Sequence, residues 1–203
     1  VGGQVIMTSQ AHERATERVA EALLKLESVH GSIYDNVVMI QGDEPLIYPE
    51  MISEVIKPLG DDKNLVSNLI SEIPTQAERN NANNVKVVFS KDNHIIYLSR
   101  EAVPSNKLFS DRIDSFRQLG LIAFRSIALK KFILLKPSRL EIIESVDMNR
   151  LIENGISIIS VITKHKAYSV DVPEDLIKVV KKMKVDKLYQ TCNHKSDRIQ
   201  LPK

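Results

Sequence analysis

The chain has 203 residues, of which 43% are hydrophobic and 27% charged, and its formal net charge is +2. This hydrophobic content is enough for one substantial core. The near-balanced charge predicts no nucleic-acid partner, because such an interface needs a concentrated basic face. A single cysteine, Cys192, excludes an internal disulfide framework and a multi-cysteine metal site. No apolar run approaches the roughly 20 residues that span a bilayer, so we expect a cytoplasmic protein without a membrane partner.

Apolar periodicity along the chain predicts strands and helices in alternation. Strands are expected at residues 4–7, 36–41, 64–70, 85–89, 95–98, 119–125, 156–163 and 168–170. Helices are expected at residues 16–26, 48–59, 127–135, 140–154 and 173–189, with loops at 75–84 and 103–115. The alternation in the first part favours a parallel sheet with helices on both faces. The closely spaced central strands favour a mixed sheet or a small inserted subdomain.

The nearly continuous apolar strand at 36–41 predicts burial on both faces, and it runs into the polar block Gln41 to Pro45. Ligands of open α/β sheets bind beyond the carboxyl ends of strands. Mg²⁺ takes one or two carboxylates together with substrate phosphates. Asp43 is therefore a candidate metal ligand, and Gln41 a candidate partner for a sugar or base. Gly42 would let the backbone turn or approach a ligand. An ordinary polar turn after a buried strand is the open alternative.

A second carboxylate, Asp171, lies where the strand predicted at 168–170 passes into a helix. It is a candidate metal ligand for the same reason as Asp43. The alternative is helix capping, since Glu174 follows three residues later and Pro173 suits a first turn. One carboxylate can serve both purposes because it has two oxygens.

Three further groups have polar side chains that could bind a ligand. Thr8 and Ser9, with Thr16 and Arg18 at a predicted helix start, could hold a nucleotide, or could simply cap an amphipathic helix. Arg100 at a strand end could clamp a carboxylate or phosphate, or lie on the surface. A third group repeats every three residues on one predicted helix face, which would bind sugar hydroxyls or face solvent; it consists of Glu141, Glu144, Asp147 and Arg150.

The order of these segments is similar to that in one known family. The matching segments are Met7-Thr8-Ser9, His12, Thr16-Glu17-Arg18, Gln41-Gly42-Asp43-Glu44-Pro45, Asn83-Asn84-Val85-Lys86-Val87-Val88, Leu98-Ser99-Arg100, Val103-Pro104, Pro137-Ser138-Arg139-Leu140-Glu141 and Val170-Asp171-Val172-Pro173-Glu174-Asp175-Leu176. Together they resemble the CMP-Kdo synthetases, the 3-deoxy-manno-octulosonate cytidylyltransferases. The resemblance runs from about Val5 to Leu176.

This resemblance implies an α/β nucleotide-diphospho-sugar transferase fold, a Rossmann-like mixed sheet with helices on both faces. It implies that CTP and a 2-keto-3-deoxy sugar acid give a CMP-sugar and pyrophosphate for surface polysaccharide. It also implies Mg²⁺ held by Asp43 and Asp171, which are the expected catalytic residues. The implied substrate-binding residues are Thr8, Ser9, Thr16, Arg18, Gln41, Gly42, Arg100, Gln118 and Asp147.

The resemblance also implies a homodimer formed through an inserted region at about 85–125. We expect one domain over residues 1–190 and a polar, frayed tail over 191–203. The sequence resembles the family only from its third strand on, so on the order of 60–70 residues that carry the phosphate-gripping loop have no counterpart here. We therefore expect the chain alone to be inactive, as a truncated remnant that acts in binding or dimerisation would be. Another alternative is a nucleotidyltransferase for a sugar 1-phosphate.

The sugar-reading positions depart from the family pattern. Gln118 and Ile122 stand where the family typically has His and Tyr, and Met148 stands where it has Gln. Methionine cannot make the hydrogen bonds of glutamine. The hypothesis is a related sugar acid, or a divergent subgroup that reads Kdo differently.

Overall fold

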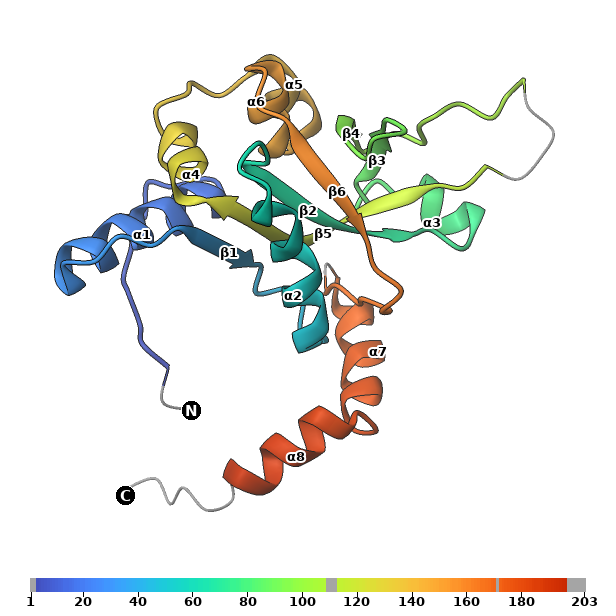
Figure 1. Cartoon of the computed structure of the whole chain (residues 1–203). Coiled ribbons are helices and arrows are strands. Elements are labelled where there is room, and N and C mark those ends of the chain that lie inside the picture. The colour runs from blue at the N-terminus through green and yellow to red at the C-terminus, as the bar shows by residue number, and fades with distance from the viewer. Residues whose placement is uncertain (1–2, 109–112, 171, 197–203) are drawn as a thin grey trace.

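A six-stranded mixed sheet forms the centre of the computed structural model, which describes residues 3–108, 113–170 and 172–196 (Figure 1). The strands are β1 (Asn36–Ile40), β2 (Val66–Glu72), β3 (Lys86–Phe89), β4 (Ile95–Ser99), β5 (Phe116–Arg125) and β6 (Ile158–Ile162). The helices are α1 (Ala15–His30), α2 (Pro49–Ile56), the 3-10 turn η1 (Lys57–Gly60), α3 (Gln76–Asn80), α4 (Ser126–Phe132), α5 (Arg139–Glu144), α6 (Met148–Glu153), α7 (Pro173–Met183) and α8 (Lys187–Ser196). None of the helices described is long and apolar enough to cross a membrane.

The long strand β5 organises the sheet, whose order is β4-β3-β5-β2-β6 with β1 also paired to β5. The start of β5 pairs with β3 and its end with β1, both antiparallel, while β2 runs antiparallel along it. Among the described strands, only β2 and β6 pair in parallel. β1 and β2 do point the same way, as the alternating pattern predicts, but β5 lies between them. The mixed sheet is therefore confirmed, whereas an all-parallel first part is wrong.

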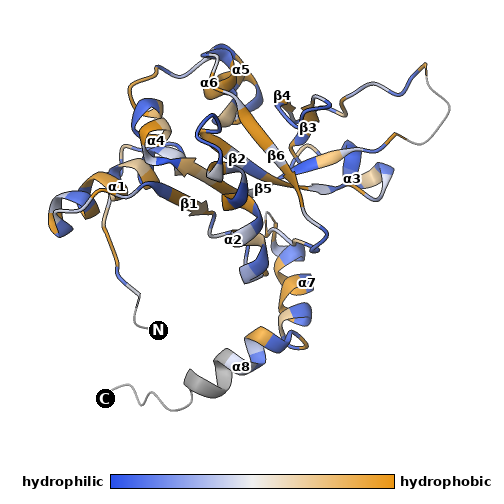
Figure 2. Cartoon of the chain, in the orientation of Figure 1, coloured by the Kyte–Doolittle hydropathy of each residue, from blue (hydrophilic) through white to orange (hydrophobic). Residues whose placement is uncertain are grey.

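Helices cover both faces of the sheet because the residues of β5 alternate between two hydrophobic clusters. Ile122 and Phe124 pack in a cluster with α1, α4 and α6. Leu119, Leu121 and Ala123 pack in a second cluster with α2. Hydrophobic residues accordingly concentrate along the strands, while helices such as α1 and α2 mix hydrophobic and hydrophilic residues (Figure 2).

Local signals in the sequence explain where several helices begin and end. α1 ends at Gly31, whose φ of 62° is left-handed and whose N–H donates to the Glu27 carbonyl at 2.9 Å. α2 and α7 begin at Pro49 and Pro173, in the first turn where proline lacks only a hydrogen bond that would not form.

The strand predictions at the two ends of the chain were wrong. Residues 4–7 and 168–170 are extended without being part of the sheet. β1 is present, but it lies at the margin of the sheet, and only Met39 of its five residues is buried. Val37 and Val38 nevertheless pack against the two hydrophobic clusters on opposite faces of the sheet, so both faces of β1 are covered as predicted, although its burial is incomplete.

One predicted loop and two predicted helices also differ from the structure. The loop predicted at 75–84 contains the short helix α3, whose first turn is capped by Thr75 accepting from the Glu78 N–H at 3.2 Å. The helix predicted at 140–154 is divided into α5 and α6 at Ser145. The helix predicted at 173–189 ends at Met183, and α8 then extends to Ser196, beyond the point where fraying was expected.

Candidate functional site

A polar pocket of about 180 Å³ opens beyond the end of β1 and beside β5. Five predicted site residues line it, namely Gln41, Asp43, Arg100, Gln118 and Asp147. The other lining residues are Glu44, Asn83, Asn84, Val85, Arg117, Leu119, Gly120, Ser145, Val146 and Ser169. Segments that are distant in the sequence thus supply amides, arginines and carboxylates to one cavity.

The floor of the pocket is made of backbone that joins the block after β1 to β5. The Gln41 N–H donates to the Gly120 carbonyl at 2.9 Å, and the Gly120 N–H donates to Glu44 Oε1 at 3.0 Å. A Cβ at Gly120 would lie 2.7 Å from Gln41 Oε1 and 2.8 Å from Gln41 Cβ, so only glycine fits. Glu44, which accepts this hydrogen bond, is itself buried.

The two predicted metal ligands belong to segments that touch each other. Asp43 is exposed at the rim of the pocket, and its carbonyl accepts the Val170 N–H at 2.9 Å. Asp171, the next residue, lies outside the described residues. The N-cap position of α7 is Val172, which makes no side-chain cap hydrogen bond, and the capping role considered for Asp171 stays a prediction. Within the described residues, no group of three or more His, Cys, Asp or Glu side chains could hold a metal.

Gly42 lies in the turn of this block and is exposed. A Cβ added to Gly42 would meet no atom within 4 Å, and this residue is not among those with positive φ. The turn itself therefore does not need glycine, contrary to one half of the expectation. Close approach of the Gly42 backbone to a ligand stays a prediction.

Arg100 is fixed beside the pocket by three hydrogen bonds to carbonyl groups. Its Nε donates to Glu144 O at 2.8 Å, Nη1 to Ala82 O at 3.0 Å and Nη2 to Ser145 O at 3.4 Å. The Glu144 carboxylate in turn accepts from the Arg100 N–H, and from the hydroxyls of Tyr97 and Ser99. Burial acts to raise the pKa of Glu144, but these hydrogen bonds outweigh it and lower the pKa below its usual value. Glu144 is therefore an ionised anchor for Arg100.

Asp147 is held from behind by α1. The hydroxyl of Thr16, which is fully buried, donates to Asp147 Oδ2 at 2.7 Å. Burial raises the pKa of Asp147 above its usual value, and the Thr16 hydrogen bond opposes this rise. Thr16 thus supports a pocket residue from behind and is not among the residues that line the pocket.

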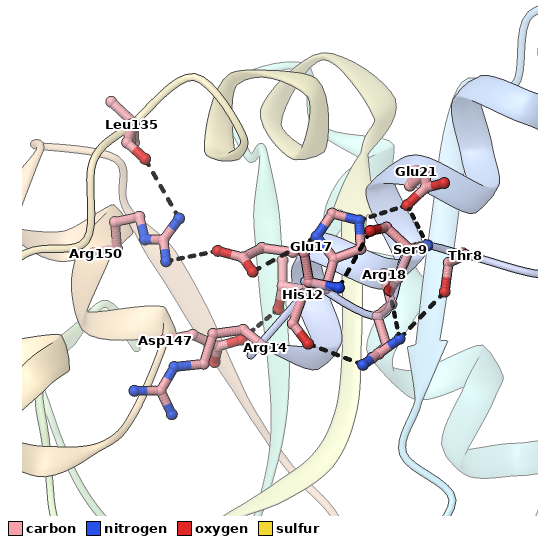
Figure 3. A network of polar contacts seen from close by, with 12 residues as sticks. Thr8, Ser9, His12, Arg14, Glu17, Arg18, Glu21, Leu135, Asp147 and Arg150 are labelled. Carbon is pink, nitrogen blue, oxygen red and sulfur yellow. Dashed lines mark hydrogen bonds and ion pairs between the residues drawn. The ribbon is translucent and has the colours of Figure 1, made fainter.

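The other residues predicted near the first helix do not reach the pocket. Arg18 donates to Thr8 Oγ1 at 3.4 Å, to Ser9 O at 3.0 Å and to His12 O at 2.8 Å (Figure 3). These contacts fasten the N-terminal segment to α1. A nucleotide-binding role for Thr8, Ser9 and Arg18 stays a prediction that the pocket geometry does not support.

Three of the four residues on the predicted polar helix face, Glu141, Glu144 and Arg150, are buried and do not face solvent. Glu141 and Arg150 are 1% and 2% exposed and form a bidentate ion pair at 2.6 and 2.7 Å. Arg150 also pairs with Glu17 at 3.1 Å and lies 4.2 Å above the Phe132 ring. Because Ser145 breaks the helix, Asp147 turns toward the pocket separately from the rest of this group.

Two of the three departures in the sugar-reading positions fall in the core. Ile122 and Met148 are 1% and 0% exposed and pack in the cluster shared with α1 and α4. Gln118 does line the pocket, where its Nε2 donates to Asn68 Oδ1 at 2.6 Å. Gln118 is therefore the departure that bears on what the pocket binds.

Sequence reasoning missed Arg117 as a pocket residue. Strand alternation places Arg117 and Gln118 on opposite faces, yet both line the pocket at its edge. The Arg117 guanidinium donates to Ser71 Oγ at 3.2 Å, Asn84 Oδ1 at 3.2 Å and Ala167 O at 2.6 Å. The sequence did contain one indication, the Asn83-Asn84 pair before β3, because these residues line the pocket and Arg117 contacts Asn84.

The mixed sheet and its polar pocket define a nucleotide-sugar transferase fold. A solved structure of CMP:2-keto-3-deoxy-manno-octonic acid synthetase complexed with CTP matches it with a TM-score of 0.79 and 29% identity, over 90% of this chain and 73% of that chain. A family model described as cytidylyltransferase matches residues 1–158.

Curated relatives agree with this match. The 3-deoxy-manno-octulosonate cytidylyltransferase of Thermodesulfovibrio yellowstonii is 37% identical over 182 residues, which cover 86% of this chain and 71% of the relative. That of Fusobacterium nucleatum subsp. nucleatum is 35% identical over 184 residues, covering 90% of this chain and 73% of the relative. The chain belongs to the cytidylyltransferase family, and within it to the 3-deoxy-manno-octulosonate cytidylyltransferases.

Proposed function

We propose that the protein transfers the cytidylyl group of CTP to a 2-keto-3-deoxy sugar acid, Kdo or a related acid, and releases pyrophosphate. The observation that carries the proposal is one pocket that holds the rim carboxylate Asp43, two fixed arginines and the carboxylate Asp147. The matched solved synthetase is complexed with CTP, and the curated relatives are named for this reaction. Both support the same substrates here.

The pocket residues suit a sugar acid. Arg100 and Arg117 place positive charge where a substrate carboxylate would bind, and guanidinium groups match carboxylates well. Asp147, Asn84 and Gln118 offer acceptors and donors to sugar hydroxyls. Because their partners hold most of these side chains before substrate arrives, little ordering is left to substrate binding.

We further propose that Asp43 and Asp171 would hold Mg²⁺. The Asp43 carboxylate is exposed at the rim, and a hard oxygen donor there fits this ion. When bound, Mg²⁺ neutralises triphosphate charge and helps activate the attacking hydroxyl. A homodimer and a place in surface polysaccharide synthesis belong to this proposal on the family resemblance alone.

The first test is the replacement Asp43→Asn. Because the chain alone is expected to be inactive, the assay uses an active full-length form, in which pyrophosphate release from CTP and Kdo with Mg²⁺ should fall by roughly 100-fold or more when this metal ligand is lost. Asp92→Asn, which changes an exposed carboxylate in the turn before β4, is the matched control and should retain wild-type turnover.

Calorimetric titration with CTP, with and without Mg²⁺, separates the alternatives. Wild-type protein that binds Mg²⁺–CTP without turnover would favour the binding-module alternative. Turnover with a sugar 1-phosphate but with no sugar acid would favour the other nucleotidyltransferase. Full activity of the Asp43→Asn variant would contradict the metal assignment.

A further inference from the structure

Lys86 is a buried cation next to the pocket that the proposed reaction does not use. It is the first residue of β3 and is 0% exposed. Its ammonium donates to Asn81 O at 3.0 Å, to Asn84 O at 2.7 Å and to Arg100 O. A lysine ammonium has three donors, and here each of them meets a backbone carbonyl.

Two of these carbonyls, those of Asn84 and Arg100, belong to residues that line two walls of the pocket. Asn83, Asn84 and Val85 form one wall, and Arg100 forms part of another. Arg100 also contacts the loop at residues 81–84 directly, because its Nη1 donates to Ala82 O at 3.0 Å. Lys86 therefore sets the separation between the asparagine wall and Arg100 from beneath, without lining the pocket itself.

The chemistry of the site requires a charged lysine and not merely a side chain of that length. Burial lowers the pKa of Lys86, and nearby Glu101 opposes this by favouring the charged form. A neutral amine would lack the third donor, and an apolar side chain would remove a hydrogen bond from the Asn84 and Arg100 carbonyls and leave Asn81 O with the Asn84 N–H at 3.1 Å. Either change would release the Asn81 to Asn84 loop.

We propose that Lys86 is a positioning residue for the sugar-acid pocket, which holds the Asn83–Asn84 wall and Arg100 in their binding arrangement through three carbonyl groups. This inference rests on the proposed function for the identity of the ligand. The geometric part, the fixed spacing of the two walls, does not depend on that ligand.

The test compares Lys86→Met with a matched variant, Arg79→Met. Arg79 is 5% exposed and likewise donates to carbonyls, those of Ala102 and Pro104, and to Ser115 Oγ at 2.9 Å. None of its partners lines the pocket. Both variants are expected to lose thermal stability, but only Lys86→Met should weaken Kdo binding, by about tenfold or more in calorimetric titration.

A second readout follows the backbone directly. In Lys86→Met, the amide NMR signals of Asn83, Asn84 and Arg100 should shift or broaden, whereas in Arg79→Met they should keep their wild-type positions. Lys86→Gln, a milder change that retains two donors, should move the same signals less and covers the case in which Lys86→Met does not fold.

The outcomes separate the two proposals. If wild-type protein does not bind any 2-keto sugar acid, the proposed function is overturned, and the amide signals still test Lys86. If these signals are unchanged in both Lys86 variants, or change equally in Arg79→Met, the positioning role is overturned. Equal loss of Kdo affinity in Lys86→Met and Arg79→Met would likewise reduce Lys86 to a general stabilising residue.

Discussion

At the scale of single residues, a hydroxyl group controls the charge of Asp147. Burial raises the pKa of this carboxyl above its usual value of 3.8, and the hydrogen bond from Thr16 lowers it. When folding raises the pKa of a carboxyl, the protonated form contributes to the stability of the folded state. This contribution is complete below the unfolded pKa and is lost as the pH rises through the folded pKa. The supporting hydroxyl therefore limits the loss at neutral pH.

The replacement Thr16→Val keeps the shape of the side chain and removes the hydroxyl. The pKa of Asp147 should rise further, and the variant should lose stability relative to wild type as pH increases above about 4. Carboxyl ¹³C NMR titration measures the first effect, and thermal unfolding at several pH values measures the second. Thr16→Ser, which retains the hydroxyl, should titrate as wild type does. An unchanged Asp147 titration in Thr16→Val would show that the hydrogen bond has no such effect.

Sequence reasoning located many of the residues of the candidate site but misjudged how some of them act. Gln41 and Arg100 lie at the ends of predicted strands, so position in the predicted sheet was enough to place them, whereas Gln118 was identified by the family resemblance. Thr16 was predicted to touch substrate because a hydroxyl at a helix start suggests it, but it is buried, in contact with Met39 of β1 and with Asp147. Arg117 was missed because simple strand alternation does not describe the edge of the pocket.

At the scale of elements, the break between α5 and α6 places Asp147 at the pocket. Ser145 has φ 52° and ψ 46°, a left-handed conformation that costs a side-chain-bearing residue roughly 1–2 kcal/mol. Its hydroxyl accepts from Arg14 Nη1 at 2.9 Å, and its carbonyl accepts from Arg100. Hydrogen bonds from Arg14 and Arg100 thus hold Ser145 in this strained conformation.

At Ser145, glycine should give a more stable protein than alanine, which is the reverse of their usual ranking within helices. Ser145→Gly relieves the left-handed strain, while Ser145→Ala keeps it and loses the Arg14 hydrogen bond. We expect the glycine variant to be about 1 kcal/mol more stable than the alanine variant in urea unfolding. In a continuous helix alanine would be the more stable by a similar amount, so that order would disprove the strain.

Sequence periodicity identified most elements, but it could not show how they join. The apolar pattern runs through Ser145 without interruption, so a single helix was expected where two exist. Alternating strands and helices indicated the common direction of β1 and β2. That β5 would insert between them depends on a pairing of distant residues that local pattern does not contain.

At the scale of the whole molecule, the buried side chain of Arg150 ties four helices together beside the sheet. Arg150 of α6 binds Glu141 of α5 and Glu17 of α1, and stacks on Phe132 of α4. Removing one partner of such a pair leaves a buried charge without compensation. A buried pair itself adds little, because desolvation offsets the attraction.

The variant Arg150→Met should therefore lose up to about 3–5 kcal/mol of stability, since the buried Glu141 keeps only the more distant Arg14, at 3.6 Å, and the Ser138 N–H, at 3.0 Å. The double variant Arg150→Met/Glu141→Met should recover a large part of that loss, because no unpaired charge remains between α5 and α6. Guanidinium unfolding of the wild type and both variants measures this. A double variant as unstable as Arg150→Met would contradict the explanation and point to lost packing on Phe132.

The backbone floor of the pocket bears on how this protein family can diverge. Where Gln41 and Gly120 meet, the contacts are made by main-chain groups and by Glu44, and Gly120 has no room for a side chain. An exposed pocket residue such as Asn83 can then change without disturbing the sheet, whereas a change at Gln118 also affects the buried Asn68 of β2. Inheritance of the floor and variation of the rim give one scaffold a route to new sugar acids, in which each step leaves a folded protein.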